Sequence, residues 1–346
     1  MFLRVWAVHR AVLLGALLAL ASVGVQAQDL RFFRIATGSA AGTYFPIGSV
    51  IASVISSPPG SPPCEGGGSC GVPGLVAVAQ TSDGSVANVT AIAKGLVDSG
   101  LAQADIVHWA YAGEGQYFRR NPLPNLRVIA NLYPETLHLV VRKAAGIERI
   151  RDLIGKRVSL DKPGSGTRVN AEIVLAAYGV SSSQLKIQEI DPGRATDLML
   201  SGDLDAFFLI AGYPASAVAD LAATGQIGLL PIQGPEAERI FKRHRFFGRD
   251  FIPDGTYVGV PAISTVSIGA QWVVAAEATE GLVYEITRAL WNPTNRDLLN
   301  AGHLQARQIR LETALSGVSI PLHPGAARYY REIGLLKAGA AEGATN

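Results

Sequence analysis

Two short turns rich in small residues constrain this chain more than any other feature. The first runs from Gly38 to Tyr44 and the second from Pro163 to Thr167, and each lies between a strand-like and a helix-like segment. Glycine leaves the backbone N–H groups of such turns accessible. A helix N-terminus adds unpaired N–H groups and the positive end of the helix dipole. Each turn is therefore predicted to bind an anion, and we expect one ligand to lie between the two.

The first 27 residues have the features of a secretory signal peptide. Arg4, His9 and Arg10 precede an apolar run over 11–21, and small residues at 25–27 allow cleavage. The apolar run is short for a membrane span. We therefore expect a periplasmic protein that is exported by this signal and carries no lipid anchor.

The composition of the remaining chain narrows the class of protein. Apolar residues make up 48% of the sequence, which is enough for two sizeable cores. The formal net charge is only +2, so nothing indicates a nucleic-acid partner. Cys64 and Cys70 lie in a glycine-rich loop and are predicted to form a disulfide in an oxidising compartment. They have no histidine neighbours, and we expect neither a metal site nor a cofactor.

Strand-like and helix-like segments alternate along the chain, which favours parallel sheets covered by helices. We predict strands at 31–37, 75–79, 105–109, 157–160, 185–189 and 205–210, and helices at 44–56, 85–97, 169–178 and 193–201. Two further extended segments, 126–132 and 136–142, are separated by Tyr133-Pro134, and a long apolar strand is predicted at 264–274. The second set of elements repeats the plan of the first.

Six motifs in a fixed order give the chain a family resemblance. They are Gly38–Tyr44, Gly84–Asn88, Asp152–Val158, Pro163–Thr167, Asp205–Phe208 with Gly212–Pro214, and Ile320–Ala326. In this order they resemble the TAXI family of substrate-binding proteins, which serve tripartite ATP-independent periplasmic (TRAP) transporters. The likeness runs from about residue 33 to residue 336. One departure is Ala41, where the family usually has glycine.

The resemblance implies an α/β protein with the two-lobed, type II periplasmic-binding-protein fold, in which each lobe is a mainly parallel sheet flanked by helices. Lobe I is expected over 30–135 and 258–336, lobe II over 136–257, and a flexible tail over 337–346. Crossover strands join the lobes, and closure is expected by bending near 133–136 and 256–264. The implied protein is a monomer and no enzyme. It binds a dicarboxylate, keto acid or glutamate-like amino acid between the lobes and delivers it to a TRAP permease.

The residue chemistry gives a candidate ligand site. Hydroxyls, backbone amides and one side-chain amide can hold a carboxylate through several charge-assisted hydrogen bonds. Two tyrosines can line the pocket, and one arginine can pair with a carboxylate. The candidates are Ser39, Gly42, Thr43, Tyr44, Gly84, Ser85, Asn88, Ser165, Gly166, Thr167, Arg168 and Tyr213. Glu114 and Gln116 are alternatives that can receive a ligand ammonium.

Other interpretations of the same residues remain open. The serines and threonines can cap helices without touching a ligand, with Thr43 as the N-cap of the first helix. A secreted serine hydrolase using Ser165 or Ser39 is the alternative function, although neither serine lies in a Gly-x-Ser-x-Gly motif. A nucleotide enzyme is disfavoured, because the chain has neither a Gly-x-Gly-x-x-Gly turn at its first strand nor a P-loop.

Overall fold

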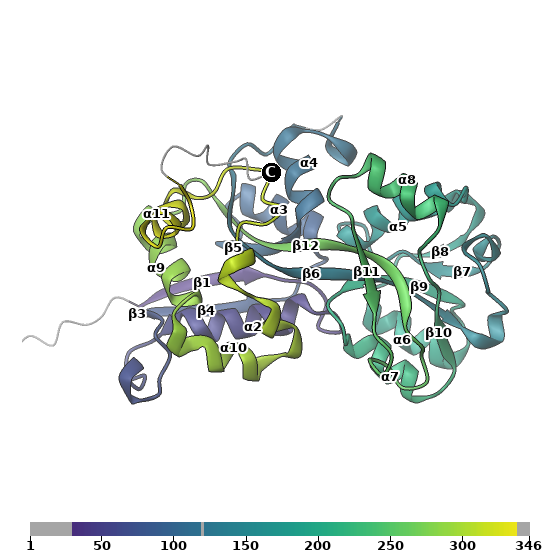
Figure 1. Ribbon diagram of the computed structural model, residues 1–346, viewed down its shortest axis with the longest axis horizontal. Coiled ribbons are helices and arrows are strands. Elements are labelled where there is room, and N and C mark those ends of the chain that lie inside the picture. The colour runs from purple at the N-terminus through teal and green to yellow at the C-terminus, as the bar shows by residue number, and fades with distance from the viewer. Residues whose placement is uncertain (1–29, 119–120, 338–346) are drawn as a thin grey trace, which may run out of the picture.

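The computed structural model describes residues 30–118 and 121–337. The predicted signal peptide lies outside the described residues, as does the predicted tail except for Lys337. A single large sheet runs through the molecule in the order β4-β1-β5-β12-β6-β9-β7-β8, with β10 beside β6 and β11 beside β12. Figure 1 shows β6 and β12 crossing the middle of the molecule, with β1 and β4 on one side and β7, β8 and β9 on the other. The chain therefore has a mixed α/β architecture, as the sequence predicts.

The outer strands of each half pair in parallel, whereas every pair that involves β6 or β12 is antiparallel. β1 pairs in parallel with β4 and β5, and β7 pairs in parallel with β8 and β9. β12 pairs antiparallel with β5 and β6, and β6 antiparallel with β9. The strands are β1 (Arg31–Ala36), β2 (Ser56–Ser57), β3 (Val72–Pro73), β4 (Leu75–Gln80), β5 (Ser99–Gln103), β6 (Leu126–Arg142), β7 (Arg157–Ser159), β8 (Lys186–Gln188), β9 (Ala206–Ala211), β10 (Ile227–Leu229), β11 (Gly248–Ile252) and β12 (Ile263–Ala275).

Helices pack around both halves of the sheet. In Figure 1, α2 and α10 lie below the sheet on the β1 side, while α5 and α8 lie above it on the β9 side. The helices are α2 (Tyr44–Ile55), α3 (Ser85–Ala93), α4 (Ala104–Ala112), α5 (Gly166–Ala177), α6 (Pro192–Ser201), α7 (Ser216–Ala223), α8 (Pro235–Arg243), α9 (Glu280–Leu290), α10 (Arg296–Gly302) and α11 (Pro324–Glu332). Short 3₁₀ turns lie at Cys64–Gly66, Gly115–Tyr117, Lys143–Ala145, Ile150–Leu153, Ser182–Gln184, Pro293–Asn295, Leu304–Gln308 and Leu311–Thr313.

The buried apolar side chains form separate clusters for the two halves. One cluster takes its members from 33–133 and from 270–336. Two others, on either face of the sheet, take theirs from 137–268 and Ala104. We call the first group lobe I and the second lobe II. The domain limits expected from the sequence stay a prediction. Ile263, Val266 and Ile268, assigned there to lobe I, pack in the clusters of lobe II.

Two sequence-based element predictions differ from the structure. Residues 105–109 are part of helix α4 and not a strand, and the third strand of lobe I is β5 just before it. A short apolar run is ambiguous between a strand and a buried helix, which explains the error. Strand β6 is continuous through Tyr133-Pro134, where two separate segments were expected. Pro134 is exposed, and the pairing with β12 passes over Leu132, so a bulge absorbs the irregularity.

The predicted disulfide is present and closes a small loop. Cys64 and Cys70 are bonded, and they follow the end of α2 through the short strand β2. The amide of Cys70 donates to the Asn295 side chain, which also donates to the carbonyl of Ala289 at the end of α9. The bridged loop is thereby attached to the helices of lobe I. Within residues 30–118 and 121–337, no helix combines the length and apolar character needed to cross a membrane.

Candidate functional site

The N-termini of four helices meet at one cavity between the lobes. The cavity has a volume of about 390 Å³ and is lined by the loop before α2 and by the starts of α3, α5 and α6. We call it the cleft pocket. Ser39 of lobe I and Ser165 of lobe II line the same cavity, so the two turns do face one space. Of the predicted candidates, Ser39, Gly42, Thr43, Tyr44, Gly84, Ser85, Ser165, Gly166 and Thr167 line the cleft pocket.

The start of α5 is held by hydrogen bonds from its own hydroxyl groups. The Ser165 Oγ accepts from the Thr167 amide at 3.1 Å, as an N-cap does, and donates to Asp161 Oδ2 at 2.7 Å. The Thr167 Oγ1 accepts from the Ile210 amide of β9 at 3.1 Å. Both hydroxyls therefore hold the turn in place. A ligand anion would be met mainly by the unpaired backbone N–H groups of the first helical turn.

The loop before α2 belongs to lobe I and forms hydrogen bonds with lobe II. Thr43 occupies the N-cap position, but its side chain makes no capping bond, so the predicted capping role is wrong. Its Oγ1 donates instead to the carbonyl of Gly212 in lobe II at 3.2 Å. The carbonyl of Ala41 accepts from the amide of Ala217 and the hydroxyl of Ser216, which are also in lobe II. The hydroxyl of Ser39 accepts a long hydrogen bond, 3.3 Å, from the amide of Ala41.

The start of α3 is built by buried polar side chains. Gly84 has a φ of 109°, which favours glycine, and its amide donates to the hydroxyl of Ser82. The hydroxyl of Ser85 accepts from the amide of Gln103 at 3.1 Å. Asn88 lies behind the pocket and not at its surface. Its Nδ2 donates to the carbonyls of Thr37 and Leu101, so its hydrogen bonds join α3 to strands β1 and β5.

Four other sequence candidates lie away from the cleft pocket. Arg168 forms an ion pair with Glu189 at 2.7 Å and lies 3.7 Å from Glu172. Tyr213 packs against the cluster formed by α6, α7 and β9. Glu114 lies 3.5 Å from His108, and Gln116 lines a separate cavity near α5 and α8. These side chains, like Asn88, are not among the residues that line the pocket. Ligand contact by them stays an untested sequence prediction.

The pocket also holds carboxyl groups that the sequence did not reveal. Glu135 of β6 and Asp161 lie on its inner surface, and Asp83 and Asp191 lie nearer the solvent. The hydroxyl of Tyr44 donates to Glu135 Oε2 at 2.5 Å. Complete burial raises the pKa of Glu135 well above its usual range, and the nearby Asp105 carboxyl raises it further. Burial also raises the pKa of Asp161 to about 6. Burial therefore opposes ionisation of both inner carboxyls.

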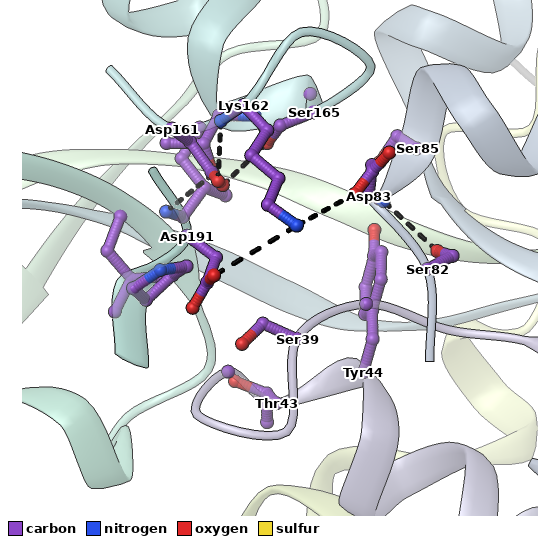
Figure 2. Close-up of a pocket in the computed structure, with 18 of the residues that line it drawn as sticks. Ser39, Thr43, Tyr44, Ser82, Asp83, Ser85, Asp161, Lys162, Ser165 and Asp191 are labelled. Atoms are coloured by element: carbon purple, nitrogen blue, oxygen red, sulfur yellow. Dashed lines mark hydrogen bonds and ion pairs between the residues drawn. The ribbon is translucent and has the colours of Figure 1, made fainter. Parts of the chain in front are cut away.

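The lobes are in contact around the pocket, so the structure is in a closed arrangement. Figure 2 shows the Lys162 side chain crossing the pocket between two carboxylates. Its Nζ lies 3.1 Å from Asp83 of lobe I and 4.0 Å from Asp191 of lobe II. The amide of Ala87 in α3 donates to the carbonyl of Gly164 in lobe II at 3.0 Å. Lys162 is the only cationic side chain among the described residues that line the pocket.

The described residues that line the pocket supply hydrogen-bonding groups and charge. No histidine is among the described residues that line it. In the part of the chain that the structure describes, no group of three or more His, Cys, Asp or Glu side chains is placed to hold a metal ion. The Ser165 hydroxyl caps α5 by accepting from the Thr167 amide and donates to Asp161. The arrangement is suited to binding a small polar molecule.

A family model supplies the identification. It matches residues 35–334, which is most of the chain and includes every element that builds the pocket. The chain belongs to the NMT1-like family. The match extends from β1 to α11, so both lobes of this NMT1-like protein are covered.

Solved structures that are similar to this chain include three with a bound small molecule. The alkanesulfonate-binding protein of Xanthomonas axonopodis pv. citri bound to MOPS is 15% identical, with 90% of this chain and 96% of that chain covered and a TM-score of 0.44. PhnD1 from Prochlorococcus marinus in complex with methylphosphonate is 14% identical, with 88% and 99% covered and a TM-score of 0.48. An ancestral arginine-binding protein bound to arginine is 15% identical, with 79% and 97% covered and a TM-score of 0.44. These values are too low to transfer a ligand to the NMT1-like protein.

Proposed function

We propose that this NMT1-like protein is a periplasmic solute-binding receptor that captures a small organic acid in the cleft pocket and delivers it to a membrane permease. The convergence of four helix N-termini from both lobes on one cavity supports the proposal most strongly. The cavity, about 390 Å³, is at the small end of the usual range for ligand pockets. The positively charged and apolar N-terminal segment agrees with export.

The partner would be a TRAP permease. The ordered motifs of the TAXI resemblance support this assignment, since they include the two turns that line the pocket. Release to the permease would require the lobes to separate. Bending at 133–136 in β6, and in the segment that leads into β12, would open the contacts that now close over the pocket.

For the ligand, the carboxyl groups favour an acidic amino acid over a dicarboxylate or a keto acid. The helix N-termini can hold a carboxylate, while Glu135 and Asp161 offer acceptors on the inner surface of the same cavity. A ligand ammonium beside these groups would lower their raised pKa values and restore the carboxylate form. A second carboxylate or a carbonyl oxygen would supply no such charge. A glutamate-like zwitterion matches both sets of groups.

Calorimetric titration with three matched compounds tests the ligand assignment. Glutamate, 2-oxoglutarate and glutarate share one carbon skeleton and differ at carbon 2, which carries an ammonium, a carbonyl or only hydrogens. We expect glutamate to bind about tenfold more tightly than either of the others, as one charge-assisted hydrogen bond would give. The variant Glu135→Gln should lower the affinity for glutamate and leave glutarate nearly unchanged. Equal binding of all three would contradict the role of the ammonium.

A receptor and a hydrolase predict different results for Ser165→Ala. In a receptor the change loosens the start of α5 and weakens ligand binding, and the wild-type protein turns over no ester. In a hydrolase it abolishes turnover of a substrate that the wild-type protein cleaves. The capping bond that Ser165 accepts from the Thr167 amide and the lack of a histidine in the described pocket lining favour the receptor.

A further inference from the structure

Gln103 places a buried amide at the inner surface of the cleft pocket. The residue ends β5 in lobe I, is 2% exposed and lines the cavity. Its backbone N–H donates to the hydroxyl of Ser85 at the start of α3. A Cβ on Gly166, the first residue of α5, would lie 1.9 Å from Gln103 Oε1 and 2.9 Å from Ser85 Oγ. The Gln103 amide therefore lies between the starts of α3 and α5, where helix N-termini favour an anion.

Lobe II fixes the direction of this amide. Asn170 of α5 is completely buried, and its Nδ2 donates to Gln103 Oε1 at 3.0 Å. The oxygen and the nitrogen of an amide point in different directions, so a bond that holds the oxygen also determines where the nitrogen points. Because Asn170 belongs to lobe II and Gln103 to lobe I, this bond exists only while the lobes are in contact.

The nitrogen of the Gln103 amide is a donor without a partner. Its Nε2 forms no hydrogen bond with any described residue, although a primary amide nitrogen can donate twice. Unlike Asn170 Oδ1, which is enclosed by protein, this nitrogen stays accessible, and Gln103 opens into the cleft pocket. An unpaired donor on so buried a side chain is costly, and a carboxylate is the acceptor that forms the strongest bonds to it.

We propose that Gln103 binds a carboxylate of the ligand through Nε2, and that Asn170 orients it for this contact only when the lobes are closed. This assignment rests on the proposed function, because it concerns the same organic acid in the same cavity. Gln103 contacts the ligand, whereas Asn170 is a positioning residue that acts through Gln103. Closure thus completes the binding site as well as covering it, and separation of the lobes frees the amide and weakens the hold on the carboxylate.

Calorimetric titration of Gln103→Leu with glutamate, 2-oxoglutarate and glutarate tests the contact. The three compounds carry the same two carboxylates, so the variant should bind each one that the wild type binds about tenfold or more weakly. Gln103→Met takes its place if the leucine variant does not fold. The matched control Gln271→Leu removes another fully buried amide, from the adjoining strand β12 and outside the cleft pocket, and should leave these affinities unchanged.

A double-mutant cycle tests the positioning role of Asn170. Asn170→Ala alone should weaken binding about three- to tenfold. Added to Gln103→Leu, it should weaken binding by less than about twofold, because no amide is left to orient. Asn170→Ser replaces the alanine variant if that one does not fold. Equal losses with and without Gln103 would mean that Asn170 acts through the packing of α5, and would overturn its positioning role.

The wild-type protein separates failure of the assignment from failure of the proposed function. If it binds none of the three compounds, the proposed function fails and this assignment fails with it. If it binds them and Gln103→Leu binds them equally tightly, only the assignment fails. The assignment also fails if the loss is confined to glutamate, since Gln103 would then face the ammonium, or if Gln271→Leu shows the same loss.

Discussion

Asp105, at the start of α4, is a buried carboxyl that should make stability depend on pH. Its Oδ1 accepts from the Ile106 amide, while its Oδ2 has no partner among the described residues. Burial raises the pKa of Asp105 to about 7, against about 3.9 in an unfolded chain. Between these two values the folded state binds more protons than the unfolded chain, so stability falls as the pH rises from about 4 to about 7 and is unaffected by this group above that range. We expect Asp105→Asn to stabilise the protein at pH 8 by about 4 kcal/mol.

Urea unfolding at pH 8 and at pH 4 checks this prediction. At pH 4 Asp105 is neutral in the folded protein, so the variant should then be no more stable than the wild type. The exposed Asp220→Asn is the matched control and should change little at either pH. An equal gain at both pH values would mean that the amide stabilises by packing and that the charge of Asp105 does not matter.

At the level of single residues, the sequence analysis identified pocket-lining residues that lie in a recognisable local motif. Ser39, Ser85 and Ser165 lie in turns between a strand and a helix, and such turns are recognisable from their small residues. Glu135 has no local signal, because it lies inside a continuous strand and reaches the pocket only through the position of β6. Arg168 follows a predicted turn, but Glu189 on a separate segment binds it. Long-range pairing of this kind cannot be derived from spacing.

At the level of elements, the start of α5 is packed directly against lobe I. A Cβ on Gly166 would lie 1.9 Å from Gln103 Oε1 and 2.9 Å from Ser85 Oγ. We expect Gly166→Ala to displace α5 from α3, to destabilise the closed protein by about 1–3 kcal/mol and to weaken ligand binding. Thermal unfolding with and without ligand measures both effects.

Gly281→Ala is the control for this change. Gly281 lies in the first turn of α9, and its added Cβ would meet nothing within 4 Å. Alanine there should be neutral or stabilise by up to about 1 kcal/mol, because alanine favours a helix. If the two variants behaved alike, close packing at the start of α5 would not be the reason for the effect of Gly166→Ala.

Helices and strands were predicted correctly where an apolar pattern was clear and turn residues marked its ends. Strand β12 was expected over 264–274 and runs from Ile263 to Ala275, since a long apolar run is typical of a buried strand. Strand β5 was missed because Ser99–Gln103 is buried on both faces and has no β-branched residue. The adjacent apolar run 105–109 was therefore predicted as the third strand of lobe I in place of β5. Helix α4 follows β5 without a loop, so no turn residue marks the boundary.

At the level of the whole molecule, polar contacts between the lobes control access to the cleft pocket. The backbone bond from Ala87 to Gly164 and the hydroxyl bond from Thr43 to Gly212 both join lobe I to lobe II. Lys162 adds an ion pair with Asp83 at the mouth, where the side chains are 40% and 50% exposed. An exposed pair contributes little to affinity, but its loss eases separation of the lobes. We therefore expect loss of the ion pair to change the rate of ligand release more than the affinity.

Lys162→Met removes this ion pair and replaces the aliphatic part of the lysine with an uncharged chain of the same length. An exposed ion pair is worth up to about 1 kcal/mol, so we expect the release rate of a cleft ligand such as glutamate to rise about two- to fivefold. High salt should raise the rate in the wild type and have a smaller effect in the variant, since salt screens the same pair. Stopped-flow displacement of bound ligand measures both rates, with the exposed Lys94→Met as the control. If Lys162→Met released ligand at the wild-type rate in low salt, the ion pair at the mouth would have no part in holding the lobes closed.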